Sequence, residues 1–120
     1  MLKVEKKLNN STTIVAEGQN HSELFASLSS LQETFGEEKC GKCGCENLKF
    51  QVRKVVDKKK EYVYHELWCT NLKCKARLNF GQRMDTQELY PKRYDMDGDK
   101  KVWKKDNGWV RWNPQTNEEE

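Results

Sequence analysis

The stretches Cys40-Gly41-Lys42-Cys43-Gly44 and Cys69-Thr70-Asn71-Leu72-Lys73-Cys74 decide the fold of this chain. Each places two thiols close enough to hold one metal ion, and about 25 residues, the length of a β-hairpin, separate the pairs. Gly44 can take the positive φ that turns the chain back under the ion. The pattern predicts a zinc ribbon with one structural Zn²⁺, held by Cys40, Cys43, Cys69 and Cys74.

The fifth cysteine, Cys45, leaves one choice of ligand open. Cys45 could ligate in place of Cys43, although the Cys-x2-Cys-Gly form favours Cys43. His21 and His65 are other conceivable ligands, but a lone histidine beside a strand is more often packed or exposed. Disulfides fit poorly, because the cysteine count is odd and residues 1–5 lack the apolar start of a signal peptide. We therefore expect reduced thiols and a cytoplasmic protein.

The composition suits one small domain with a modest core. The chain has 120 residues, of which 35% are hydrophobic, and its mean hydropathy is −1.05. Metal binding would supply folding free energy that such a core lacks. The sequence contains no run of about 18 apolar residues, so we expect no interaction with a membrane.

Charge is distributed unevenly along the chain. Residues 1–38 carry three lysines against six acidic residues, a net charge of −3, and Glu118-Glu119-Glu120 adds another −3. Residues 39–112 carry 19 Lys and Arg against 10 Asp and Glu, a net charge of +9. A basic body of this kind is typical of proteins that bind polyanions.

The first 38 residues predict a β-hairpin followed by an amphipathic helix. Residues 2–17 alternate around the turn sequence Asn9-Asn10-Ser11. Residues 21–35 have helical periodicity, with Asn20 as the cap. The expected apolar stripe is core or a homodimer seam; it comprises Leu24, Phe25, Leu28, Leu31 and Phe35.

Residues 39–114 predict the zinc ribbon and a C-terminal extension rich in aromatic and basic residues. Alternation over 47–56, 61–69 and 76–82 indicates three strands. In the extension we expect an Asp-Gly turn at 95–99 and one hairpin pairing residues 102–103 with 109–110. Residues 115–120 are expected to form a disordered acidic tail. The fold class is α+β, mostly β: a four-cysteine zinc ribbon with an N-terminal β-hairpin and one amphipathic helix.

Aromatic residues interleave with basic ones in the middle and C-terminal parts of the body. Unpaired bases stack on aromatic rings while Lys and Arg contact phosphates, so this composition favours single-stranded over duplex nucleic acid. The expected nucleic-acid-binding residues are Arg53, Tyr62, Tyr64, Lys75, Arg77, Lys92, Arg93, Trp109 and Arg111.

The region from about Glu23 to Pro114 resembles small zinc-ribbon proteins encoded by bacteriophages. The resemblance is carried by the four cysteines and by the stretches Glu23-Leu24-Phe25, Leu31-Gln32-Glu33-Thr34-Phe35-Gly36, Phe80-Gly81-Gln82, Tyr90-Pro91-Lys92-Arg93 and Gly108-Trp109-Val110. It implies a protein that binds single-stranded DNA and acts in phage replication or recombination. Such a protein would work in the cytoplasm of an infected bacterium. The chain departs from the family pattern in having four residues between Cys69 and Cys74.

Two functions from different classes remain open. The first is a single-stranded nucleic-acid binder in phage replication or recombination. The alternative is a zinc-stabilised adaptor or inhibitor that binds a host or defence protein through the N-terminal third and the aromatic C-terminal segment. We expect no enzyme, because four cysteine ligands leave no open coordination position on the metal.

Overall fold

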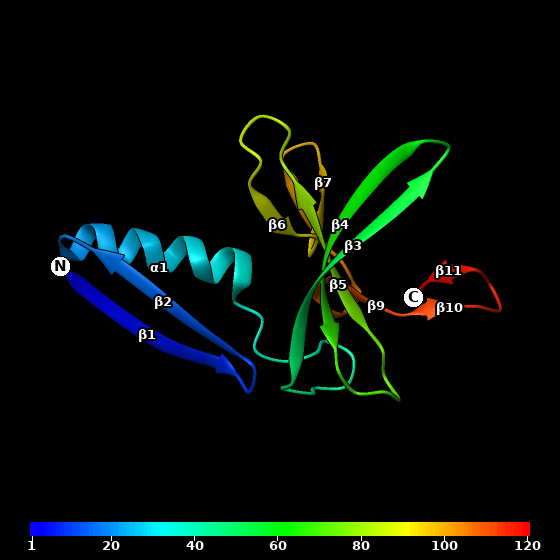
Figure 1. Cartoon of the computed structure of the whole chain (residues 1–120), viewed down its shortest axis with the longest axis horizontal. Coiled ribbons are helices and arrows are strands. Elements are labelled where there is room, and N and C mark those ends of the chain that lie inside the picture. Colours follow the sequence, from blue (N-terminus) through cyan, green and yellow to red (C-terminus); the bar gives the residue numbers. More distant parts are fainter.

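The computed structural model describes all residues from 1 to 120. It is mostly β with one helix, begins with a β-hairpin and brings four cysteines together, which confirms the predicted fold class. Figure 1 shows the hairpin and the helix at one end of an elongated molecule, joined by a linker to a twisted sheet. No helix of the chain is both long and apolar enough to cross a membrane.

The N-terminal unit is a hairpin covered by the helix. Strands β1 (Leu2–Asn9) and β2 (Thr12–Gly18) pair antiparallel, and helix α1 (His21–Phe35) packs mainly on β2. Asn20 caps the helix, because its side-chain oxygen accepts a hydrogen bond from the Glu23 amide at 2.9 Å.

The apolar stripe of α1 is narrower than predicted. Leu24, Leu28, Leu31 and Phe35 are half-buried, but Phe25 is 75% exposed, so its assignment to the stripe is wrong. The reason is geometric, since each residue advances about 100° around the helix and Phe25 therefore lies beside the stripe that Leu24 begins. No residue of α1 is fully buried.

The sheet is antiparallel and contains the ribbon. Its strand order is β3 (Leu48–Asp57), β4 (Lys60–Cys69), β5 (Arg77–Gln82) and β6 (Leu89–Pro91), and β9 (Trp109–Val110) pairs with one end of β5. The predicted strands at 47–56, 61–69 and 76–82 correspond to β3, β4 and β5. Strands β3 and β4 extend beyond their neighbours as a two-stranded arm, because β5 pairs with β4 only over residues 65–68 (Figure 1).

The C-terminal extension differs from the sequence prediction in two places. Residues 102–103 do not pair with 109–110: β8 (Lys100–Trp103) pairs with β7 (Tyr94–Asp97), whereas β9 joins the sheet. The two-residue turn Gly98-Asp99 closes the β7–β8 hairpin, and only Gly98 has a positive φ, as in a type II′ turn. A 3₁₀ turn, η1 (Lys105–Gly108), then leads into β9.

The acidic tail is also ordered, where the sequence predicted disorder. Strand β11 (Glu118–Glu119) pairs with β10 (Trp112–Asn113). Composition alone predicts disorder for such a segment, but here Glu119 forms an ion pair with Arg77 of β5. The tail therefore has a partner that is distant in sequence.

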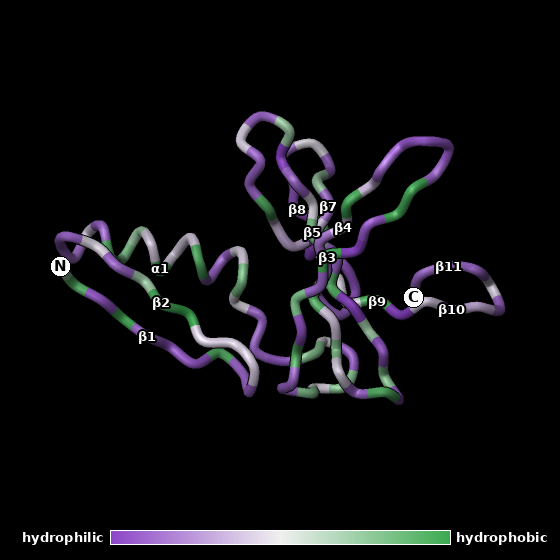
Figure 2. Tube along the Cα trace, viewed as in Figure 1, coloured by the Kyte–Doolittle hydropathy of each residue, from purple (hydrophilic) through white to green (hydrophobic).

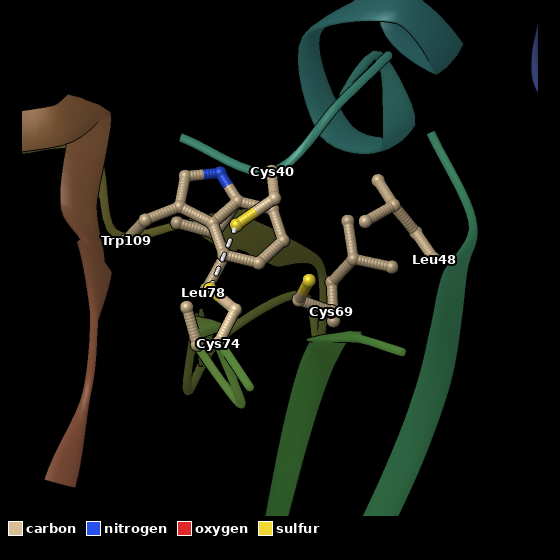
Figure 3. Packing of buried hydrophobic residues seen from close by; sticks show 8 residues of the cluster. Cys40, Leu48, Cys69, Cys74, Leu78 and Trp109 are labelled. Atoms are coloured by element: carbon tan, nitrogen blue, oxygen red, sulfur yellow. Dashed lines mark hydrogen bonds between the residues drawn. The ribbon is translucent and has the colours of Figure 1, made fainter. Parts of the chain in front are cut away.

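The core lies at the end of the sheet that carries the cysteines. One cluster contains eight buried residues: Cys40, Leu48, Leu67, Cys69, Cys74, Ala76, Leu78 and Trp109. Figure 3 shows Trp109 and Leu78 beside the cysteine side chains. Leu8, Ile14 and Ala16 form the separate, smaller core of the N-terminal unit.

The tip of the β3–β4 arm has an unfavourable backbone. Lys58 and Lys59 both adopt left-handed conformations, with φ of 50° and 68°, in a two-residue turn between Asp57 and Lys60. Positive φ at both central residues is the type I′ pattern, which Asn-Gly fits best. Figure 2 shows that this tip is hydrophilic.

Replacing Lys58→Asn together with Lys59→Gly should raise the free energy of unfolding by about 1 kcal/mol, because it relieves two left-handed non-glycine residues. Urea denaturation of the metal-loaded protein measures this. The matched control, Lys58→Gln with Lys59→Gln, removes the same charges but leaves the backbone conformation unfavourable. Equal stability of the two variants would show that the tip does not form this turn.

Candidate metal centre and aromatic–basic sheet face

Two chain turns deliver the four thiols. In the first turn the Gly44 amide donates to the Cys40 carbonyl at 2.9 Å, and Gly44 has φ of +77°. In the second, the amides of Cys74 and Lys75 both donate to the Asn71 carbonyl at 3.0 Å, and Lys75 has φ of +54°. The residue after the last cysteine thus takes the left-handed conformation in both turns, so the longer spacing of the second pair still gives a compact turn.

The geometry of the thiols fits one tetrahedral ion. All four sulfur atoms lie within 4.8 Å of one another. The Cys40 and Cys74 sulfurs are 3.7 Å apart (Figure 3), and those of Cys43 and Cys69 are 3.5 Å apart. Bonds of about 2.3 Å from a central ion to four sulfurs would place neighbouring sulfurs about 3.8 Å apart. The four cysteines, none in a disulfide, could therefore hold a metal ion.

The structure also resolves the choice between Cys43 and Cys45. The Cys43 thiol belongs to the cluster, whereas Cys45 is outside it and interacts with the main chain of Asn47. His21 and His65 are not part of the cluster either. The Cys-x2-Cys-Gly spacing thus selects the cysteines that converge.

Positive charge lies next to the thiols. The Arg111 guanidinium donates to the Cys74 sulfur at 3.2 Å. Burial raises the pKa of the Cys74 thiol, but this hydrogen bond and others outweigh it and lower the pKa to about 7. Burial raises the pKa values of Cys40 and Cys69. Arg111 therefore favours the thiolate form of one ligand and offsets part of the negative charge of a four-thiolate site.

Trp109 connects the centre to the linker that follows α1. Its side chain is 1% exposed, and its indole nitrogen donates to Glu37 at 3.1 Å. The Arg93 guanidinium lies 2.6 Å from the same carboxylate. A Cβ on Gly41 would approach the indole ring to 2.5 Å, so the first cysteine turn needs glycine there.

These positions revise several of the predicted nucleic-acid contacts. The prediction that Trp109 stacks on bases is wrong, because the ring is buried in the core. Arg93 and Arg111 are engaged by Glu37 and Cys74 respectively. Lys75 and Lys92 are exposed, but Lys75 lies in the second cysteine turn and Lys92 follows β6.

The remaining four predicted residues, Arg53, Tyr62, Tyr64 and Arg77, share one face of the sheet. Their strand register and alternation place them together with residues that the sequence analysis did not assign. We call this surface the aromatic–basic face; it comprises Lys49, Arg53, Tyr62, Tyr64, Glu66, Trp68, Arg77, Asn79 and Tyr90. The period-2 pattern of residues 77–81 could have indicated Asn79, but the contribution of Tyr90 depends on pairing of β5 with β6.

Glu66 organises the centre of the aromatic–basic face. Its buried carboxylate accepts hydrogen bonds from Arg53 at 3.3 Å and from the Trp68 indole at 3.0 Å. The Arg77 Nε lies 3.6 Å from the same carboxylate. Arg53 also stacks on Tyr64, with its guanidinium carbon 4.6 Å from the ring centroid. Both arginines are thus held by Glu66: Arg53 lies over Tyr64, and Arg77 lies opposite Trp68.

Comparisons with protein-family models, curated proteins and solved structures found no match to this chain.

Replacing Cys69→Ser should abolish metal binding and unfold the sheet, because three thiolates cannot complete the tetrahedral site around which the core packs. Cys45→Ser is the matched control, and it should change the free energy of unfolding by about 1 kcal/mol or less. Metal content per chain and circular dichroism measure the two effects. Full metal content in Cys69→Ser, or metal loss in Cys45→Ser, would contradict the ligand assignment.

Proposed function

We propose that the chain is a zinc-stabilised protein that binds single-stranded nucleic acid on the aromatic–basic face. The observation that carries the proposal is the exposure of three tyrosines on one side of the sheet. Tyr62, Tyr64 and Tyr90 are 43%, 42% and 42% exposed although they lie in paired strands. Large aromatic rings left partly in water, one of them beside the oriented Arg53 guanidinium, suit stacking with unpaired bases.

The metal that fits this role is Zn²⁺. Four thiolates in tetrahedral arrangement are typical of zinc or of iron–sulfur centres, and a single closed four-thiolate site is typical of structural zinc. The ion would hold the two cysteine turns together and leave the chemistry of binding to the sheet face. Elemental analysis of the purified protein tests the identity of the metal.

The surface chemistry favours single strands. A tyrosine ring can stack only on the face of an unpaired base, because the bases of a duplex are stacked on one another. The three tyrosines present such rings, not side chains that read base edges in a groove. Lys49 is exposed on the same face and forms no ion pair in the structure, so it can contact a phosphate. The resemblance to phage-encoded zinc-ribbon proteins would place this activity in the replication or recombination of phage DNA.

A second candidate is the protein-binding module, and the opposite face of the β3–β4 arm favours it. Phe50, Val52, Val56 and Val63 share this face, and all four are exposed. Exposed apolar residues of this kind are typical of protein contacts, including contacts between two copies of one chain, and the ion pair of Lys54 with Glu61 separates Val52 from Val56 on this face. Sedimentation of the wild type and Val52→Lys tests self-association through it.

Tyr64→Leu should weaken binding of a labelled oligothymidylate about tenfold, because one stacked base contributes about 1–3 kcal/mol. Tyr64→Phe should retain most of the affinity, since it keeps the ring. Phe25→Leu is the matched control, because this exposed aromatic lies on α1, away from the face. Fluorescence anisotropy measures all three. Equal effects of Tyr64→Leu and Phe25→Leu would contradict stacking on this face.

Lys49→Gln should reduce the slope of log K against log salt by about 0.7, the value for one phosphate contact on a single strand. Lys6→Gln removes another exposed charge, from β1, and should leave the slope unchanged. The same anisotropy titrations at several salt concentrations provide both slopes. Absence of single-strand binding by the wild type at about 50 mM salt, where phosphate contacts are strong, would reject the proposed function.

A further inference from the structure

The acidic segment Glu118–Glu120 reaches back to the aromatic–basic face. The Glu119 carboxylate forms an ion pair with Arg77 and accepts from the Asn79 amide at 3.5 Å. Both partners lie on β5, about 40 residues earlier in the chain. The negative segment thus contacts the part of the face where positive charge is oriented.

The main chain holds this segment in place. The amides and carbonyls of Arg111 and Glu120 exchange two hydrogen bonds of 2.7 Å. The Asn113 side chain donates to the Glu120 carboxylate at 2.8 Å. Strand β11 is therefore positioned next to the sheet by pairing with β10, and Glu119 reaches Arg77 from a fixed backbone.

The Arg77 guanidinium is oriented to bind an anion where the Glu119 carboxylate now lies. Glu66 lies beside its Nε, whereas its Nη2 faces Glu119. An arginine held in this way, with an amide donor from Asn79 beside it, suits a carboxylate or a phosphate oxygen equally well. Although partial burial raises the pKa of Glu119, Arg77 outweighs that effect and keeps the pKa below its ordinary value, so the carboxylate is ionised at neutral pH.

We propose that Arg77 and Asn79 form a phosphate subsite of the aromatic–basic face, and that Glu119 occupies this subsite until a nucleic-acid phosphate displaces it. This inference rests on the proposed function. It adds that Glu119 and the nucleic-acid phosphate compete for Arg77 and Asn79. The acidic segment raises the concentration of nucleic acid needed for binding without blocking the tyrosines, since its ion pair and side-chain hydrogen bonds with the sheet involve only Arg77 and Asn79.

The ion pair between Glu119 and Arg77 is weak enough for a phosphate to displace Glu119. The side chains of Arg77 and Glu119 are 26% and 39% exposed, and ion pairs of this exposure contribute little to stability. Strands β10 and β11 each have only two residues. Releasing Glu119 should therefore change affinity by about two- to fivefold, not by orders of magnitude.

Glu119→Gln in the full chain tests the inference, with oligothymidylate as the probe. It should bind about two- to fivefold more tightly than the wild type, because the subsite loses its internal anion. Glu118→Gln is the matched control: it removes the same charge from the neighbouring residue of β11, whose side chain points to the other side of the strand. Its affinity should stay close to that of the wild type.

A double-mutant cycle with Arg77→Gln locates the effect. If Glu119 competes for Arg77, Glu119→Gln should no longer raise affinity once Arg77 has been replaced. Equal gains for Glu118→Gln and Glu119→Gln, or a gain that persists without Arg77, would show general repulsion by the acidic segment and overturn the subsite. Wild-type binding without any gain in Glu119→Gln also overturns it while leaving the proposed function intact. If neither the wild type nor Glu119→Gln binds, both proposals are rejected.

Discussion

The rest of the structure depends on the convergence of four thiols at one end of the sheet. Three of these cysteines belong to the eight-residue core, so the metal centre and the hydrophobic core are one structure. Only 16 of 120 residues are buried, which is few for a chain of this length. A metal held by the thiols would supply folding free energy where apolar burial is small, and its binding would be coupled to folding.

Because the core is confined to one end of the sheet, the other end has no buried face. Beyond the buried residues, β3 and β4 continue as an arm whose two faces are both exposed to solvent. One face carries Tyr62, Tyr64 and Arg53, and the other face of these two strands carries valines and Phe50. Because the metal end fixes the strand register, side chains far from the ion are held in a constant order on each face. The cysteine end thus fixes the order of side chains on the face for which we propose nucleic-acid binding.

The sequence was most informative where spacing or periodicity is local. The two cysteine pairs, the hairpin, the helix and the three main strands could all be predicted from such patterns. The partners of Trp109, Arg93 and Arg111 could not, because each depends on contacts between segments distant in the chain. The order of the acidic segment escaped prediction for the same reason, since it depends on Arg77. Composition identified basic and aromatic residues but could not divide them between core and surface.

The most direct test is an NMR titration of the metal-loaded protein with a short single-stranded oligonucleotide. We expect amide shifts to change along β4 and β5 around Tyr64 and Arg77, while those of α1 and the N-terminal hairpin stay unchanged. We also expect changes at Glu119 as the acidic segment leaves the face. Shift changes confined to α1, or to the apolar face around Val52, would contradict the assignment of nucleic-acid binding to the aromatic–basic face.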